Sequence, residues 1–402
     1  MSTSDYFAPI APVPRSVCAV LVAFLLAPKI GVLDLSVIAL IIGFLVHVRR
    51  IALSRDVAFL VIIFTIIFVL VLLSGMANQI ITFENLLKPI RNFLLILLLY
   101  SLLQKQALTL DKLFDVLIFA GMINSIVVLL QVIFTLIGLD DAVLRFYPPG
   151  ETIDGLRKPG LSSGYPSSGL LSCIAAVVAL YKYCFNADKR YFWLLLMCLP
   201  GVFLSARTAV VLFFVAFGLA ILIAFVNRNL RFLAHMGGLA FILISLVGAL
   251  FAYDPKIYDI FYVMFEFVFV YLDEGSVGVR STDDLLQNHF FLPRDLVEWL
   301  VGNGRAAWGL GGIESDVWFT QNLVGSGVFV MSLYLIAFGF IWWSAIKATM
   351  GFYRLTVFYI FLMVFIASFK GSFIFSRFVG DAATLLGVWS LVYINRKRLN
   401  NH

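Results

Sequence analysis

Twelve apolar runs separated by polar turns constrain the fold of this chain more than any other feature of its sequence. Hydrophobic residues make up 62% of the chain and charged residues 13%, and the mean hydropathy is +1.01, which excludes an ordinary water-soluble protein. A helix of roughly 20 apolar residues crosses the hydrocarbon core of a bilayer. We therefore predict an all-α, polytopic transmembrane helical bundle that forms a single membrane domain over residues 1–402. The predicted spans lie near residues 17–28, 32–48, 57–74, 88–103, 112–137, 163–181, 191–204, 208–226, 232–251, 317–345, 354–369 and 373–394.

The polar turns predict the orientation of the bundle, because Lys and Arg concentrate on the cytoplasmic side of membrane proteins. Every second turn is basic, from Arg49-Arg50 after the second run to Arg396-Lys397-Arg398 after the last. Both termini are therefore expected in the cytoplasm. No small-residue cleavage site follows the first run, so we expect it to be retained as a helix.

One polar segment, residues 253–315, is much longer than a turn between two helices requires. The predicted orientation places it outside, between the ninth and tenth spans, where we expect a lid; a solvated cap with structural tryptophans is the alternative. Its stretch Asp283–Leu300 has apolar residues at helical spacing and predicts a helix that breaks near Pro293. Residues 302–312 contain five glycines and predict a backbone turn that allows a close approach. The apolar stretch Ile257–Leu272 is expected to lie as a helix in the outer interface of the membrane.

Basic residues on the outward side need an explanation, because membrane insertion disfavours them there. Arginine binds phosphate oxygens through two parallel hydrogen bonds and stays charged when it is partly buried. We therefore predict a basic, outward-facing cavity that holds the phosphate-bearing group of a lipid. The alternative is that each residue reaches the membrane surface or pairs with a carboxylate, as Arg377 could with Asp381. The predicted phosphate-binding residues are Arg91, Arg157, Lys158, Arg207, Arg280, Arg294, Arg305 and Arg377.

Cysteine and histidine carry no recognisable metal chemistry in this sequence. The four residues of each type show no zinc-binding spacing, and no cysteine lies in a predicted outer loop. We expect no metal, no cofactor, no disulfide framework and no nucleic-acid partner.

Four features follow one another along the chain: Arg91 near the head of the fourth span, the turns Arg157-Lys158-Pro159-Gly160-Leu161-Ser162 and Ser205-Ala206-Arg207-Thr208, and the long outer segment that leads into Ser315-Asp316 and Gly325-Ser326-Gly327. In this order they resemble the Wzy-type O-antigen and capsule polymerases, within the superfamily of O-antigen ligases and polymerases. The resemblance covers roughly residues 88–345. It implies a GT-C-like glycosyltransferase of the bacterial inner membrane with a periplasmic active site and no metal or nucleotide sugar. The implied partners are an oligosaccharide linked to undecaprenyl pyrophosphate, membrane lipid and a chain-length regulator protein.

The end of the long segment favours a polymerase within that superfamily. Ligases, which attach polymer to lipid A-core, typically show a histidine motif where this chain has Glu314-Ser315-Asp316-Val317. In a polymerase, a hydroxyl of one lipid-linked repeat unit attacks the anomeric carbon of a lipid-linked glycan, and pyrophosphate leaves. Asp316 is the first choice for the general base, with Glu314 and His289 as alternatives. A ligase, a transporter or flippase for lipid-linked sugars, and a structural scaffold are the other functions to be weighed.

Overall fold

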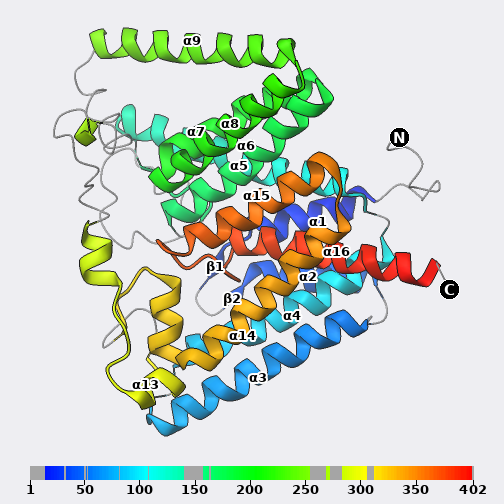
Figure 1. The fold of residues 1–402 in the computed structure, drawn as a ribbon, viewed down its shortest axis with the longest axis vertical. Coiled ribbons are helices and arrows are strands. Elements are labelled where there is room, and N and C mark those ends of the chain that lie inside the picture. The colour runs from blue at the N-terminus through cyan, green and yellow to red at the C-terminus, as the bar shows by residue number, and fades with distance from the viewer. Residues whose placement is uncertain are drawn as a thin grey trace.

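The computed structural model describes residues 14–30, 33–48, 51, 53–80, 82–106, 108–139, 157–162, 164–253, 269–271, 283–305 and 312–400. Within these segments every predicted apolar run forms a helix, which confirms the all-α class (Figure 1). The only strands there are an antiparallel pair of two residues each, β1 (Lys29–Ile30) and β2 (Leu33–Asp34). The helices of the runs are α1 (Arg15–Leu26), α2 (Leu35–His47), α3 (Arg55–Ala77), α4 (Phe83–Lys105), α5 (Leu110–Leu136), α6 (Tyr165–Asn186), α7 (Lys189–Ser205), α8 (Arg207–Val226), α9 (Leu230–Tyr253), α14 (Trp318–Ala348), α15 (Gly351–Ala367) and α16 (Val379–Asn400).

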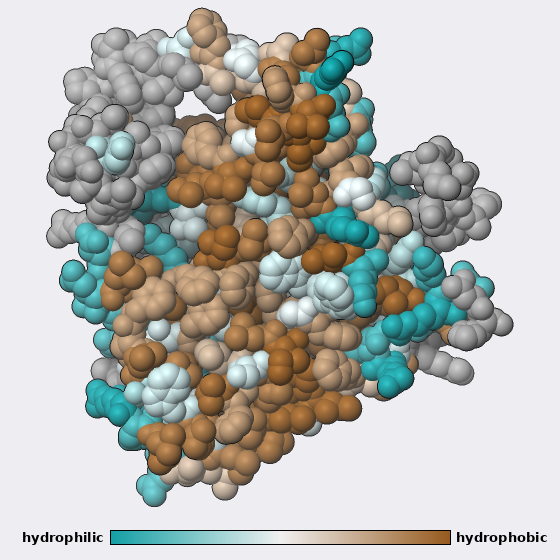
Figure 2. Space-filling model, in the orientation of Figure 1, coloured by the Kyte–Doolittle hydropathy of each residue, from teal (hydrophilic) through white to brown (hydrophobic). Residues whose placement is uncertain are grey.

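The described helices are those of a membrane protein, although not all of them are long enough to cross a bilayer. Six are long and apolar enough among the described residues: α3, α4, α5, α6, α8 and α14. The helices α1 and α2 have 12 and 13 residues. They extend about 18–20 Å, against roughly 30 Å for a hydrocarbon core. Broad hydrophobic areas cover the face shown in Figure 2, as expected of a surface that contacts lipid. Twelve full crossings stay a prediction.

The bundle has two distinct ends, which Figure 1 shows at its two sides. At one of them the end of α16 meets the start of α3, where Arg398 Nη1 lies 2.8 Å from Asp56 Oδ2. At the same end, Lys182 of α6 lies 2.8 Å from Asp111 Oδ1 and 2.9 Å from Asp115 Oδ1. We call this the terminal end. The opposite end, which carries residues 283–305 and 312–317, is the loop end.

Small residues allow the helices around α6 to pack closely. Nearly all residues of α6 are buried, and its neighbours are α5, α7 and α8. A Cβ atom added at Gly121 of α5 would overlap with the Cβ of Ala175 in α6. A Cβ atom added at Gly201 of α7 would overlap with the hydroxyl of Ser172. Glycines at such contacts let helix backbones approach each other inside a membrane.

Replacing Gly121 by valine is expected to destabilise the protein by about 1–3 kcal/mol or more, because the added side chain forces α5 and α6 apart. The matched control is Gly218→Val in α8, where an added Cβ meets no atom within 4 Å. Both changes put a β-branched residue into an apolar helix, so only the packing differs. Thermal unfolding in detergent should show a lower midpoint for Gly121→Val than for Gly218→Val. Equal midpoints would contradict this account of the packing.

The glycines that follow α13 (Leu296–Val301) confirm the predicted close approach for the part of the run that is described. Helix α14 bends at Gly327, where φ is +83°. The bend exposes two α14 carbonyl groups, which accept hydrogen bonds from the backbone of Asn303 at 2.8 Å and Gly304 at 3.0 Å. On the other side, Asn78 Nδ2 donates to Gly302 O at 3.0 Å. A Cβ at Gly302 would come within 2.6 Å of the α14 backbone. The close neighbour is therefore the protein's own chain.

The helix predicted over Asp283–Leu300 is broken as expected. A π-helical turn, η3 (Leu285–His289), and the short helix α13 are separated by non-helical residues around Pro293. Of the predicted interfacial helix Ile257–Leu272, only residues 269–271 are described, and they are helical. The rest of that prediction lies outside the described residues.

Candidate functional site

A cavity of about 200 Å³ lies at the loop end, where segments far apart in the sequence meet. Two predicted phosphate-binding residues, Arg157 and Arg207, line it together with Lys370. Two predicted catalytic residues, His289 and Asp316, line it as well. We call this the main cavity. It combines cations with carboxylate and imidazole groups, which is the combination needed to bind an anion beside a proton acceptor.

The turn that carries Arg157 is held by two buried amide side chains of α5. Gln131 Nε2 donates to Gly160 O at 3.0 Å, and Gly160 N donates to Gln131 Oε1 at 2.9 Å. Asn124 Oδ1 accepts from Leu161 N at 3.0 Å. Buried amides are costly unless their hydrogen bonds are made. These bonds therefore fix the position of the turn at the edge of the main cavity.

Two helix N-termini also open onto the main cavity. Helices α6 and α8 both start there, and Pro166 and Thr208 of their first turns line it. Their N-cap residues, Gly164 and Ala206, make no side-chain capping hydrogen bond within the described structure. Pro166 has no N–H, but the helix dipoles of α6 and α8 and the remaining first-turn N–H groups favour negative charge at this point.

The ring of His289 lies between a backbone N–H and a carboxylate. The backbone N–H of Asp316 donates to His289 Nδ1 at 3.0 Å, so Nε2 carries the proton when the ring is neutral. Nε2 lies 3.6 Å from Asp284 Oδ2, so the ring N–H faces a carboxylate oxygen. Ser315 Oγ also donates to His289 O at 2.7 Å. The ring therefore suits positioning or proton donation, and the exposed carboxylate of Asp316 is the better proton acceptor.

Two residues of the main cavity were not among the predicted site residues. Lys370 follows the end of α15, and Asp284 precedes η3; both line the cavity. In the sequence, each of the two lies at the loop end of an apolar or helical segment. That position could have indicated them as site residues. Conversely, two predicted site residues do not line the main cavity: Glu314, which is exposed, and Lys158, which is buried.

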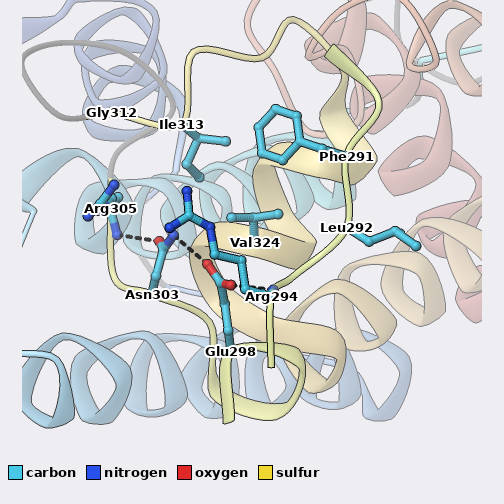
Figure 3. A pocket seen from close by; sticks show the side chains of 9 residues that line it. All are labelled: Phe291, Leu292, Arg294, Glu298, Asn303, Arg305, Gly312, Ile313 and Val324. Atoms are coloured by element: carbon cyan, nitrogen blue, oxygen red, sulfur yellow. Dashed lines mark hydrogen bonds between the residues drawn. The ribbon is translucent and has the colours of Figure 1, made fainter. Parts of the chain in front are cut away.

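A second cavity, of about 230 Å³, lies between α13, α14 and the residues after η3 (Figure 3). Arg294 and Arg305 both line it, opposite an apolar wall that includes Ile313. Glu298 and Asn303 organise its polar side: Asn303 Nδ2 donates to Glu298 Oε1 at 2.8 Å. Glu298 Oε2 accepts from the backbone of Arg294 at 2.6 Å, and Asn303 Oδ1 accepts from that of Arg305 at 3.0 Å. These bonds hold the two arginine backbones and leave both guanidinium groups at the cavity.

Arg91 and Arg377 lie in a different place, a network of four charged side chains of which Asp381 is buried and the other three are partly buried. Arg91 Nε is 2.6 Å from Asp34 Oδ2, and its Nη2 is 2.6 Å from Asp381 Oδ2. Arg377 Nη2 is 3.2 Å from Asp34 Oδ1. Pairing with carboxylates, the alternative to phosphate binding, therefore describes both arginines. The carboxylate 3.2 Å from Arg377 is Asp34, whereas Asp381, the partner suggested by the sequence for Arg377, pairs with Arg91.

Arg280 lies outside the described residues, so its predicted role stays a prediction. Within the described segments, no group of three or more His, Cys, Asp or Glu residues could hold a metal ion.

No protein-family model matches the chain, and no curated protein matches it. The interpretation of the site therefore depends on its own geometry.

Proposed function

We propose that this chain is a membrane glycosyltransferase that polymerises oligosaccharide repeat units carried on undecaprenyl pyrophosphate. One observation carries the proposal: Arg157, Arg207, Lys370 and two uncapped helix N-termini converge on a single cavity that also contains Asp316. Such a cavity suits an anionic leaving group next to a hydroxyl that loses its proton. The resemblance to Wzy-type polymerases points to the same reaction.

In the proposed reaction, the pyrophosphate of the donor occupies the main cavity. The guanidinium groups of Arg157 and Arg207 match phosphate oxygens in geometry and charge. The first-turn N–H groups of α6 and α8 add further donors. Negative charge builds up on the pyrophosphate as its bond to the sugar breaks, and these groups stabilise that charge. Loss of one such donor typically costs about 10²–10³ in rate.

The acceptor supplies the hydroxyl that attacks the anomeric carbon of the donor. A bond forms between the acceptor oxygen and that carbon, while the bond from the carbon to the pyrophosphate oxygen breaks. The hydroxyl proton passes to the carboxylate of Asp316. His289 positions Asp316 through the hydrogen bond at Nδ1, and Asp284 in turn orients His289.

The second cavity is the proposed place for part of the bound glycan. Arg294 and Arg305 offer donors to sugar oxygens or to a phosphate, and the apolar wall suits a sugar face. Glu298 and Asn303 act there as positioning residues, because their hydrogen bonds hold the arginine backbones.

The proposal includes the predicted topology: twelve spans in a GT-C-like arrangement, within the bacterial inner membrane. The loop end faces the periplasm and the terminal end faces the cytoplasm. Basic residues at the terminal end, such as Lys182, Lys347 and Arg398, support that orientation. Membrane lipid and a chain-length regulator are the further proposed partners.

The deciding experiment is incubation of the purified protein with undecaprenyl-pyrophosphate-linked repeat units. We expect a ladder of polymer from the wild type and none from a variant with Arg157 and Arg207 both replaced by alanine. The matched control replaces Arg190 and Arg231, two exposed arginines at the terminal end, and should keep the ladder. A folded wild-type protein that makes no ladder but moves repeat units across vesicles would contradict the polymerase and favour a transporter.

A ligase is the second candidate, and one contact favours it. His289 Nδ1 lies 3.0 Å from the backbone of Asp316, so the fold brings a histidine to the segment where ligases carry theirs. Adding a lipid A-core acceptor to the same assay separates the two activities. A ligase transfers the glycan to lipid A-core, whereas a polymerase lengthens the glycan on undecaprenyl pyrophosphate.

A further inference from the structure

We infer that the terminal end of the bundle carries a binding site for the headgroup of an anionic phospholipid. A cavity of about 230 Å³ lies there between the ends of α14 and α16. It is lined by Lys347, Lys397 and Arg398 together with apolar and aromatic side chains. We call it the terminal cavity. It is separate from the main cavity, and the inference does not depend on the proposed transferase activity.

The positive charge of the terminal cavity favours the binding of an anion. Three cations line it and no carboxylate does. Arg398 binds Asp56 at 2.8 Å through Nη1. Lys347 and Lys397 are exposed, and neither has an ion-pair partner among the residues that the structure describes. The two lysines therefore leave uncompensated positive charge at the cavity.

The spacing of residues in α16 explains why the side chains that line the terminal cavity lie close together. Tyr393 and Lys397 are four residues apart, as are Ile394 and Arg398, so all four share one face of the helix. Helix α14 packs against α16 and contributes Lys347 from its last turn. The cations thus meet where two packed helices leave the apolar part of the bundle.

The surroundings of the cavity favour a lipid over a free phosphate ion. Trp343 is 58% exposed, and Lys347 Nζ lies 4.9 Å from the centre of its ring. Exposed tryptophan and lysine at a helix end are typical of the headgroup level of a bilayer. Met350, which is 66% exposed, and Ile394 add apolar surface to the wall. In Figure 2 hydrophilic surface lies directly beside hydrophobic surface at this end of the molecule. Basic pockets between membrane helices on the cytoplasmic side bind anionic headgroups.

Native mass spectrometry of the detergent-purified protein tests the inference, with phosphatidylglycerol and phosphatidylcholine of identical chains as probes. We expect the wild type to retain phosphatidylglycerol selectively. Lys347→Ala with Lys397→Ala should weaken that binding about thirty-fold, since each cation near an anionic surface contributes roughly 1 kcal/mol. Lys397→Ala alone should weaken it about five-fold on the same basis.

The matched control is a double variant of Lys105 and Lys189, exposed lysines that lie outside the terminal cavity. It removes the same charge from the protein and should change the affinity by less than about two-fold. Equal retention of both lipids by the wild type would overturn the inference. Undiminished phosphatidylglycerol binding by the Lys347 and Lys397 variant would also overturn it. Displacement of the lipid by inorganic phosphate alone would show a site for the free ion instead.

Discussion

Replacing Asp316 by asparagine is expected to lower the rate of polymerisation by about 10²–10⁴-fold while the protein stays folded. The amide has nearly the shape of the carboxylate, but it cannot take a proton from the attacking hydroxyl. The side chain is exposed at the main cavity, so little packing depends on it. The measurement is the initial rate of repeat-unit consumption by purified protein, at several substrate concentrations and several pH values. The expected change is in kcat, with KM nearly unchanged.

Glu314→Gln is the matched control for this prediction. Glu314 is also an exposed acid, two residues away, but it lines neither the main cavity nor the second cavity beside α13. Its variant should keep the wild-type rate and the wild-type dependence of the rate on pH. A similar loss of kcat in both variants would contradict the assignment of the base to Asp316. A rise in KM alone for Asp316→Asn would assign the residue to sugar binding.

The helices were predictable because backbone polar groups inside a bilayer must bond within their own segment. Apolar runs of this length therefore become helices, whatever their neighbours are. The number of crossings was less predictable, because α1 and α2, with 12 and 13 residues, are too short to cross a hydrocarbon core of roughly 30 Å as straight helices. The bend of α14 at Gly327 depends on a distant contact with residues 302–304, which no local pattern reveals.

The site was predictable where a residue's place followed from the topology. Arg157, Arg207 and Asp316 each lie just before or at the start of a helix at the loop end, so orientation alone placed them on one side. Their meeting with Lys370 and Asp284 required the tertiary packing of several helices. Outward charge by itself also could not separate an arginine that lines a cavity from one that pairs with buried carboxylates.

A substitution of Arg91 tests whether this arginine pairs with a buried carboxylate or binds phosphate. Replacing Arg91 by methionine is expected to cost about 3–5 kcal/mol of stability, because it leaves a buried charge without its partner. That charge is Asp381, whose side chain is 2% exposed and lies 2.6 Å from Arg91 Nη2. We expect a large drop in the yield of folded protein from membranes and a lower midpoint of thermal unfolding in detergent.

The double variant Arg91→Met with Asp381→Leu is expected to recover most of the lost yield and stability. It removes both members of the pair, and a buried ion pair replaced by apolar groups of similar volume is often close to neutral in stability. Asp34 keeps a partner in this variant, because Arg377 lies 3.2 Å away. If Arg91→Met instead folds normally and loses only polymerisation, Arg91 binds the pyrophosphate, as outward charge predicts. If the double variant is no more stable than the single one, the pair does not explain why an arginine lies inside this helix. Recovery by the double variant would mean that Arg91 holds α4 to α16 as the partner of the buried Asp381.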